Sequence, residues 1–544
     1  MFMALNERIK VKIPDNKITF KKGKGNAIYV YYTIKAYRRT SDGRPTSDEV
    51  CIGKKDQESG MLIPNSKYYE LFTNSSDTDY TILSIRNYGP FFLLDKIASS
   101  LNLIQILKNV FPNSYKSILT CAFYMVTKGN VMKYANYWSQ ENVTYLDYPL
   151  VNQRVSELFA SITFEERMKF FKLWTDNIID DNEYIAYDVT SISSYSPKIT
   201  TVEYGYNRDG EDLPQINLGI YIGEKTKLPI FYNTYSGSII DKEQLIYMLK
   251  YTKELGIEKI KFVMDKGFYK RDNLRYMINN NHLFLICLSN SYLFTRANIE
   301  KVKTIIKLPS NWIDEYQVFG YCVQYKQDDI TANLHIIYNP DKQVDEQKIT
   351  YSTIYRLRQE LETLEVLPED INKYERFFDI TKVNNQKNKF TFILNEDKVI
   401  KALSTTGYAV FMTTDLVLSP KEVIAIYRNK DVIEKCFDNL KNELDFSRLR
   451  THEDKTTEGK IFVGFISLIL RMYLSNKLNI NSKDQKKINI TTTEVLLEME
   501  KIKITSLSNE KTLMMQLTKL QKDILACVGT SADELLKSLD NLPR

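Results

Sequence analysis

The pattern of hydrophobic and polar positions changes several times along the chain. Residues 1–90 contain short runs such as ITFKKGKGNAIYVYYTIKAY, separated by turn-forming residues, and these predict strands. Over residues 91–180 the hydrophobic residues recur three and four positions apart, as in FFLLDKIASSLNLIQILKNVF, which indicates helices. We therefore predict a β-rich N-terminal region over 1–90 and a helical module over 91–180.

From residue 184 onward the pattern becomes typical of strands. The runs YIAYDVTSI, INLGIYIG, LPIFYNTYSG, KIKFVMDKGF and HLFLICLSN are rich in β-branched and aromatic residues, and a helical pattern separates the third run from the fourth. This order predicts an α/β sheet with both antiparallel and parallel strand pairs. Further strand-like segments follow over 315–415, then an apolar helix over 459–477 and a polar, helical tail over 478–544.

The stretch YRNKDVIEKCFDNLKNEL, residues 427–444, has the spacing of one helix that begins near Ser419, an N-cap residue followed by a proline. At about 100° of rotation per residue, four polar residues fall within an arc of roughly 60° beside an apolar stripe: Tyr427, Lys430, Glu434 and Lys441. Such a helix can bury its apolar stripe and hold a carboxylate, two ammonium groups and a phenol along the edge. A solvated face aligned by chance is the alternative.

Composition limits the classes of protein and of site. The 544 residues fit about two to four domains with ample hydrophobic core. The apolar run IFVGFISLIL is too short to span a bilayer, so we expect a buried helix and no membrane partner. Six cysteines without a Cys-x-x-Cys pair predict neither a disulfide framework nor a zinc site, and favour the cytoplasm. With only three histidines, any metal is expected on carboxylates, which suit Mg2+ or Mn2+.

The positive charge is concentrated at the N-terminal end. Residues 1–60 hold 13 Lys/Arg against 7 Asp/Glu, a surplus of six that equals the net charge of the whole chain. Within this end, cations alternate with tyrosines in FKKGKGNAIYVYYTIKAYRR, a combination that suits a nucleic-acid backbone and its bases. A twisted hairpin with a solvated lysine edge is the alternative.

Two aspartates occupy unusual positions for their residue type. Asp188 and Asp265 lie at or near the ends of apolar strands, where ligands gather in open α/β sheets, although aspartate is disfavoured within strands. Each could instead cap a local turn. Together with Glu434 they form a set of three carboxylates, which can hold two divalent ions about 4 Å apart for phosphodiester transfer. We therefore expect the three carboxylates to converge.

These motifs together resemble the DDE transposases of bacterial insertion sequences. The closest branch is the insertion-sequence-four and Tn-five type, whose signature is Tyr-x2-Arg-x3-Glu-x6-Lys. Tyr427, Glu434 and Lys441 match its spacing, and Lys430 stands at the arginine position, where neighbouring Arg428 could compensate. YDVTSI and MDKGF are similar to the motifs that carry the two aspartates, and the resemblance extends over about residues 88–475.

The resemblance implies an RNase H-like core formed by residues 184–294 and 405–477, with a strand-rich domain inserted over 295–404. It implies that Asp188, Asp265 and Glu434 are catalytic and bind two Mg2+ or Mn2+ ions. Further, it implies that four residues bind DNA: Tyr427, Arg428, Lys430 and Lys441. The substrates would be the element's terminal inverted repeats and target DNA, held by a homodimer, with cut-and-paste transposition of the element.

Two other functions remain compatible with the sequence. An RNase H-fold DNA nuclease or resolvase would use the same carboxylates without strand transfer. A DNA-binding repressor that has lost catalysis would keep the fold, although all three acids are present. A strand-transfer assay with paired DNA ends separates these functions.

Overall fold

The structure is a computed structural model that divides into two compact units. It describes residues 10–23, 27–39, 43–57, 59–72, 82–179, 183–254, 260–366, 370–382, 390–478, 490–508 and 511–541. The first unit comprises Met1–Trp174, Ser194–Thr200 and Asp438–Arg544, and the second comprises Thr175–Ser193 and Thr201–Phe437. The fold is mixed α/β with one large sheet.

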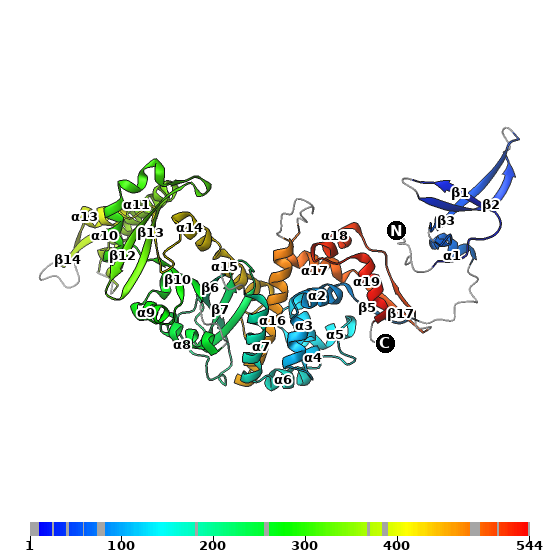
Figure 1. Ribbon diagram of the computed structural model, residues 1–544, viewed down its shortest axis with the longest axis horizontal. Coiled ribbons are helices and arrows are strands. Elements are labelled where there is room, and N and C mark those ends of the chain that lie inside the picture. The colour runs from blue at the N-terminus through cyan, green and yellow to red at the C-terminus, as the bar shows by residue number, and fades with distance from the viewer. Residues whose placement is uncertain are drawn as a thin grey trace. The chain divides into compact units, whose positions relative to one another are not determined.

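The second unit is built on that large sheet. Among the described residues, nine strands join in the order β11-β12-β13-β16-β10-β9-β6-β7-β8 (Figure 1). Their bounds are β6 (Tyr184–Ser193), β7 (Gln215–Gly223), β8 (Pro229–Ser236), β9 (Lys261–Met264), β10 (Leu283–Leu288), β11 (Trp312–Ile313), β12 (Val318–Gln327), β13 (Ile330–Tyr338) and β16 (Tyr408–Thr413). β9 pairs in parallel with both β6 and β10, and the other pairs are antiparallel.

The apolar runs form strands whose side chains are buried on both faces of the sheet. All nine residues of β7 are buried, as are all but one of the ten in β6, and the exception is Asp188. Such continuous burial is typical of strands covered on both sides. Helix α8 (Asp241–Glu254) connects β8 to β9 and packs against α9 (Arg271–Asn279), which connects β9 to β10.

The segment 295–404, expected as a separate strand-rich domain, is only partly separate. After helix α10 (Leu293–Val302), its strands β11, β12 and β13 extend the large sheet beyond β16. The rest of the segment has a small core of its own, which includes Ile354, Leu357 and Phe377. Its elements are α11 (Pro340–Thr363), α12 (Asn372–Glu375), β14 (Phe378–Lys382), β15 (Phe390–Leu394) and α13 (Glu396–Leu403).

The prediction of one continuous helix over 427–444 is wrong. Helix α14 (Pro420–Arg428) ends before Lys430, α15 (Asp431–Asp438) begins after it, and a π-helical turn (Asn439–Glu443) follows. Asn429 caps α14 and Lys430 lies in the turn between the helices. Asparagine and aspartate compete for backbone hydrogen bonds and so favour helix ends, which explains a break at Asn429-Lys430-Asp431.

The first unit contains a helical core. Helix α16 (Asp454–Leu478) packs against α2, α4 and α6. By length and composition alone α16 could cross a membrane, but 78% of its most apolar window is buried inside the fold. This burial is typical of the central helix of a protein core, as the sequence indicated. The surrounding helices are α2 (Gly89–Ser100), α3 (Leu103–Val110), α4 (Tyr115–Lys128), α5 (Ala135–Glu141), α6 (Asn152–Ser161) and α7 (Phe164–Ile178).

The two ends of the chain are partly β-structured. Four antiparallel strands, β1 (Ile18–Lys22), β2 (Ile28–Arg38), β3 (Pro45–Lys55) and β4 (Leu62–Pro64), pack with α1 (Ser66–Phe72) around Val30, Ile52 and Leu62. The C-terminal region was expected to be a helical tail, but it also contains strands. Besides α17 (Thr492–Glu500), α18 (Lys519–Cys527) and α19 (Ala532–Ser538), it contributes β17 (Lys503–Leu507) and β18 (Thr512–Met514). β17 pairs with both β18 and β5 (Ile82–Asn87) in one three-stranded sheet.

Candidate active site

The strand register places two of the predicted acids side by side. β6 and β9 run parallel with Ala186 opposite Val263, and the same register continued by two residues brings Asp188 level with Asp265. Side chains two positions apart in a strand share a face, so both carboxylates lie on one face of the sheet. Asp265 follows β9 directly in an extended conformation, and its carboxylate accepts a hydrogen bond from the amide of Lys266.

Lys430 binds both aspartates. Its ammonium nitrogen is 3.7 Å from Asp188 Oδ2 and 3.8 Å from Asp265 Oδ2, and only 11% of the lysine side chain is exposed. Burial raises the pKa of Asp188, and the charge of Lys430 opposes that increase. The turn between α14 and α15 thus delivers one positive charge to two carboxylates that would otherwise repel each other.

Tyr427, at the end of α14, contacts the carboxylate oxygen of Asp265 that does not face Lys430. Its hydroxyl donates to Asp265 Oδ1 at 3.2 Å, and its ring packs on Phe411 with centroids 4.6 Å apart. Burial, together with neighbouring Cys287 and Asp265, raises the pKa of the Tyr427 hydroxyl. A phenol that stays protonated is a permanent hydrogen-bond donor, so Tyr427 fixes the orientation of the Asp265 carboxylate.

The third predicted acid does not join the first two in this structure. Glu434 is exposed on α15. Within the part of the chain that the structure describes, no three His, Cys, Asp or Glu side chains are arranged to hold a metal ion. Asp188 and Asp265 nevertheless fit a hard cation, because they are oxygen donors that already share one positive group, the ammonium of Lys430.

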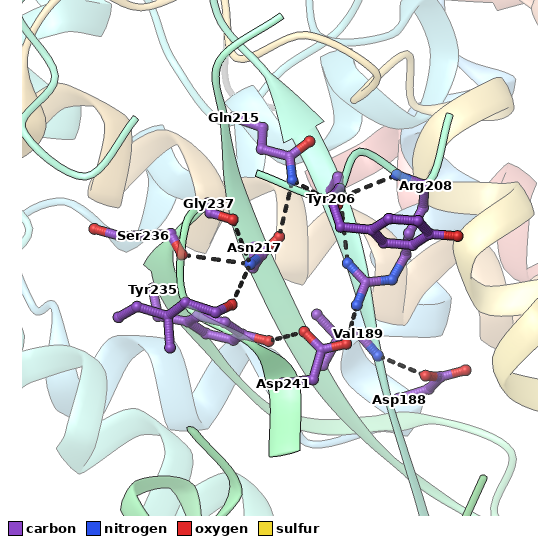
Figure 2. A network of polar contacts seen from close by, with 12 residues as sticks. Asp188, Val189, Tyr206, Arg208, Gln215, Asn217, Tyr235, Ser236, Gly237 and Asp241 are labelled. Carbon is purple, nitrogen blue, oxygen red and sulfur yellow. Dashed lines mark hydrogen bonds and ion pairs between the residues drawn. The ribbon is translucent and has the colours of Figure 1, made fainter. Parts of the chain in front are cut away.

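A polar network beside Asp188 was not anticipated from the sequence (Figure 2). Arg208, from the connection between β6 and β7, forms an ion pair with Asp241 and donates to Ser191 Oγ at 3.2 Å. Asp241 also accepts a hydrogen bond of 2.6 Å from Tyr235. Burial raises the pKa of Asp188, and the charge of Arg208, like that of Lys430, opposes this increase. The sequence alone gave no signal that Arg208 would lie beside Asp188.

Gly237 explains how the connection that carries Arg208 is fixed. A Cβ atom at Gly237 would lie 2.4 Å from the carbonyl oxygens of Gln215 and Glu203. Asn217 donates to the carbonyl oxygen of Gly237 at 3.4 Å and to that of Ser236 at 3.3 Å (Figure 2). The end of β8 therefore packs directly on the backbone of Glu203 and Gln215, two residues that flank the part of the connection that carries Arg208.

The remaining predicted DNA-binding residues lie apart from the acid pair or in the other unit. The guanidinium of Arg428 lies over the ring of Tyr316, 4.5 Å from its centroid. Lys441 belongs to the first unit, in the π-helical turn Asn439–Glu443, and is half-buried. Contact of either residue with DNA stays a prediction.

Comparison with protein families identifies the domain that contains this site. The family model described as "Transposase DDE domain" matches residues 181–470, which is more than half of the chain. The chain belongs to the transposase DDE domain family. The matched span begins just before β6 and ends within α16, so this transposase DDE domain includes Asp188, Asp265 and the α14–α15 segment.

Comparison with solved structures and with curated proteins adds little to this membership. A piggyBac transposase synaptic complex with hairpin DNA, solved by cryo-EM, is similar with a TM-score of 0.32 and 9% sequence identity, over 83% of this chain and 76% of that one. A similarity this low transfers no residue role to the DDE domain described here. Among curated proteins, none matches the chain.

Proposed function

We propose that this protein is a DNA transposase of the insertion-sequence-four and Tn-five type. It cleaves DNA at the ends of an insertion sequence and joins the freed 3′-hydroxyl to target DNA. It acts by cut-and-paste as a homodimer on the terminal inverted repeats, in the bacterial cytoplasm. The observation that carries the proposal is the paired position of Asp188 and Asp265 on β6 and β9, within a chain of the DDE family.

The order of the strands supports an RNase H-like core. β8, β7 and β6 are consecutive antiparallel neighbours, and β9 and β10 continue from β6 in parallel. Three antiparallel strands followed by two parallel ones is the arrangement expected of such a core. It places the middle of β6, where Asp188 lies, beside the end of β9, which Asp265 follows directly.

Asp188, Asp265 and Glu434 are the residues that would hold two Mg2+ or Mn2+ ions. When bound, such ions activate the attacking hydroxyl and stabilise the leaving oxygen in phosphodiester transfer. The protein's own side chains prepare the site. Tyr427 orients Asp265, and Lys430 balances the charge of both aspartates until DNA supplies a phosphate for it to bind.

Glu434 enters the proposal through its position in the chain and the family signature. Glu434 lies in the first turn of α15, which begins directly after Lys430, so we propose that metal binding draws this short helix toward the aspartates. Exposure leaves the side chain free to move. Lys441 is proposed as a phosphate contact because it matches the family signature. Arg428 is proposed as one because it lies next to Lys430, which stands at the arginine position of that signature.

The test is cleavage and strand transfer with paired DNA ends, whose sequences are found as inverted repeats flanking the gene. We expect Mg2+-dependent joining by the intact protein and none by Asp188→Asn, Asp265→Asn or Glu434→Gln. Asp345→Asn, an exposed acid on α11, is the control and should remain active. Strand transfer by Glu434→Gln would remove Glu434 from the site.

The same assay separates the two alternative functions. Cleavage without joining would identify a nuclease or resolvase. Specific binding of the ends, with neither cleavage nor joining, would identify a repressor. Either result would contradict the transposase proposal.

A further inference from the structure

A positively charged cavity lies next to the acid pair in the second unit. It has a volume of about 740 Å³ and is bordered by the end of β10, the start of β16 and helices α11 and α13. Cys287 links it to the site, because its side chain lines the cavity and contacts the Tyr427 hydroxyl that holds Asp265. Lys266, which also lines the cavity, directly follows Asp265.

The lining has a strong excess of cations. Two acids, Glu346 and Glu375, face six basic residues: Lys266, Arg296, Lys342, Arg376, Lys398 and Lys401. Lys342 pairs with Glu346 and Lys398 pairs with Asp379. Among the described residues, the other four have no acidic partner within ion-pair distance. Cations brought together from several elements with too few acids to balance them repel one another, so such a lining indicates an anionic ligand.

Two polar atoms of the lining also lack partners. The side-chain oxygen of Asn290 and the hydroxyl of Tyr408 are buried and have no hydrogen bond within the described part of the chain. The amide nitrogen of Asn290 is satisfied, since it donates to the carbonyl oxygens of Tyr408 and Thr405. Buried polar atoms are costly to leave unpaired, so a small side-chain shift that brings these two atoms to a ligand or an ordered water in the cavity would stabilise the protein.

We propose that this cavity binds an unpaired DNA strand next to the phosphodiester that the acids cleave. A DNA duplex is too wide to enter a cavity of this volume, whereas a single strand can place successive phosphates along it. The lining suits such a strand, with cations for the backbone and amide and hydroxyl groups for the bases. The inference rests on the proposed function for the identity of its ligand.

The test is binding of a short fluorescent oligothymidylate, measured by anisotropy without metal at several salt concentrations. Lys401→Gln removes an unpaired cation from the lining, and Lys348→Gln removes an exposed lysine from α11 outside the cavity. We expect Lys401→Gln to weaken binding about tenfold, as for one lost charge-assisted contact. It should also reduce the salt slope by about 0.7. Lys348→Gln should bind like the unmodified protein.

Three results would overturn the proposal. Equal losses in both variants would mean general electrostatic attraction, and unchanged binding by Lys401→Gln would mean that the strand does not enter the cavity. Displacement of the oligonucleotide by an equal concentration of a nucleoside triphosphate would assign the cavity to a small phosphate ligand. Oligonucleotide binding is measured without metal, so it does not depend on catalysis. A failure of the strand-transfer assay would therefore contradict the proposed function without deciding whether the cavity binds a DNA strand.

Discussion

At the scale of single residues, the candidate active site is organised by Lys430. The sequence suggested that Lys430 replaces an arginine that grips DNA phosphate, and the structure places its ammonium between Asp188 and Asp265. These two roles are compatible if the lysine exchanges partners when metal ions and DNA arrive. Such an exchange balances charge at every stage, because carboxylates are never left without a cation.

Replacing Lys430 with glutamine should make the metal-free protein less stable and its metal affinity higher. Without the ammonium the aspartates repel each other, which should lower the free energy of unfolding by about 1–2 kcal/mol at this partly exposed site. Mg2+ or Mn2+ would no longer compete with a resident cation and should bind about tenfold more tightly. Calorimetric titration measures the affinity, and denaturant unfolding with and without metal measures the stability.

The control for this variant is Lys435→Gln. Lys435 forms an exposed ion pair with Asp431 on α15, so its loss should cost less than 1 kcal/mol and leave metal affinity unchanged. If the Lys430 variant bound metal no better than the control, the ammonium would not occupy the position that the metal needs.

The sequence correctly predicted that Asp265 follows a strand directly, because it ends a strong apolar run, but Asp188 lies in the middle of β6 and not near its end. It could not predict that Lys430 joins them, because that contact depends on how the α14–α15 turn packs against the sheet. Arg208 was missed for the same reason, since its partner Asp241 begins a helix beyond two intervening strands. Local patterns specify elements, whereas these side-chain pairs arise only from tertiary packing.

At the scale of elements, α14 is fixed at its start by a capping box. Ser419 accepts from the amide of Glu422, and Glu422 accepts from the amide of Ser419. Val423 and Ile424 then bury one face of the helix against β12, β13 and neighbouring strands. This anchoring determines where Tyr427 and the following turn lie. The sequence predicted the cap at Ser419. It did not predict the break at Asn429, because the spacing of Tyr427, Lys430, Glu434 and Lys441 fits one continuous helix.

Replacing Ser419 with alanine should therefore affect both stability and cleavage. Loss of the cap should reduce the free energy of unfolding by about 1 kcal/mol and loosen the start of α14. Thr491→Ala is a matched control, because Thr491 and Glu494 form the same capping box at the start of α17 in the first unit. We expect a similar loss of stability from both variants and slower DNA cleavage only from Ser419→Ala. Equal cleavage rates would show that α14 does not position the site.

Helix α16 carries an unusual buried lysine. Lys460 is 3% exposed, its ammonium donates to the carbonyl oxygen of Leu449 at 2.8 Å, and burial lowers its pKa to about 7. Between that pKa and the ordinary value of 10.5, the unfolded chain binds a proton that the folded chain does not. Stability should therefore rise with pH above about 7, by up to about 1.4 kcal/mol per pH unit.

Lys460→Met tests this dependence, because methionine has similar length without a titrating group. Denaturant unfolding of both proteins between pH 6 and pH 9, chosen as about one to two units either side of the expected transition, measures the difference. The variant's advantage in stability should be largest below about pH 7 and should shrink as pH rises. A difference that does not change with pH would mean that Lys460 stays charged in the folded protein.

At the scale of the whole molecule, the charge surplus and the predicted chemistry belong to different parts of the chain. The surplus of six cations lies within residues 1–60. The described residues between 10 and 72 form β1–β4 and α1 around a small core of their own. Several large side chains on these strands are exposed, among them Phe20, Tyr29 and Tyr37. Exposed rings among cations are the features that nucleic-acid surfaces require, and a solvated hairpin edge has no need of the rings.

Deleting residues 1–72 should accordingly weaken DNA binding and flatten its dependence on salt. Each phosphate contact contributes about 0.9 to the slope of log affinity against log salt for duplex DNA, so the loss of several contacts is easily measured. Some cations are already neutralised within this region, such as Lys21 by Glu49 and Lys10 by Asp56, so the slope should fall by less than the total number of cations. A shortened protein that keeps the stability of its α16 core but loses slope would assign DNA binding to the N-terminal strands. An unchanged slope would mean that these strands do not bind DNA and form only a solvated hairpin.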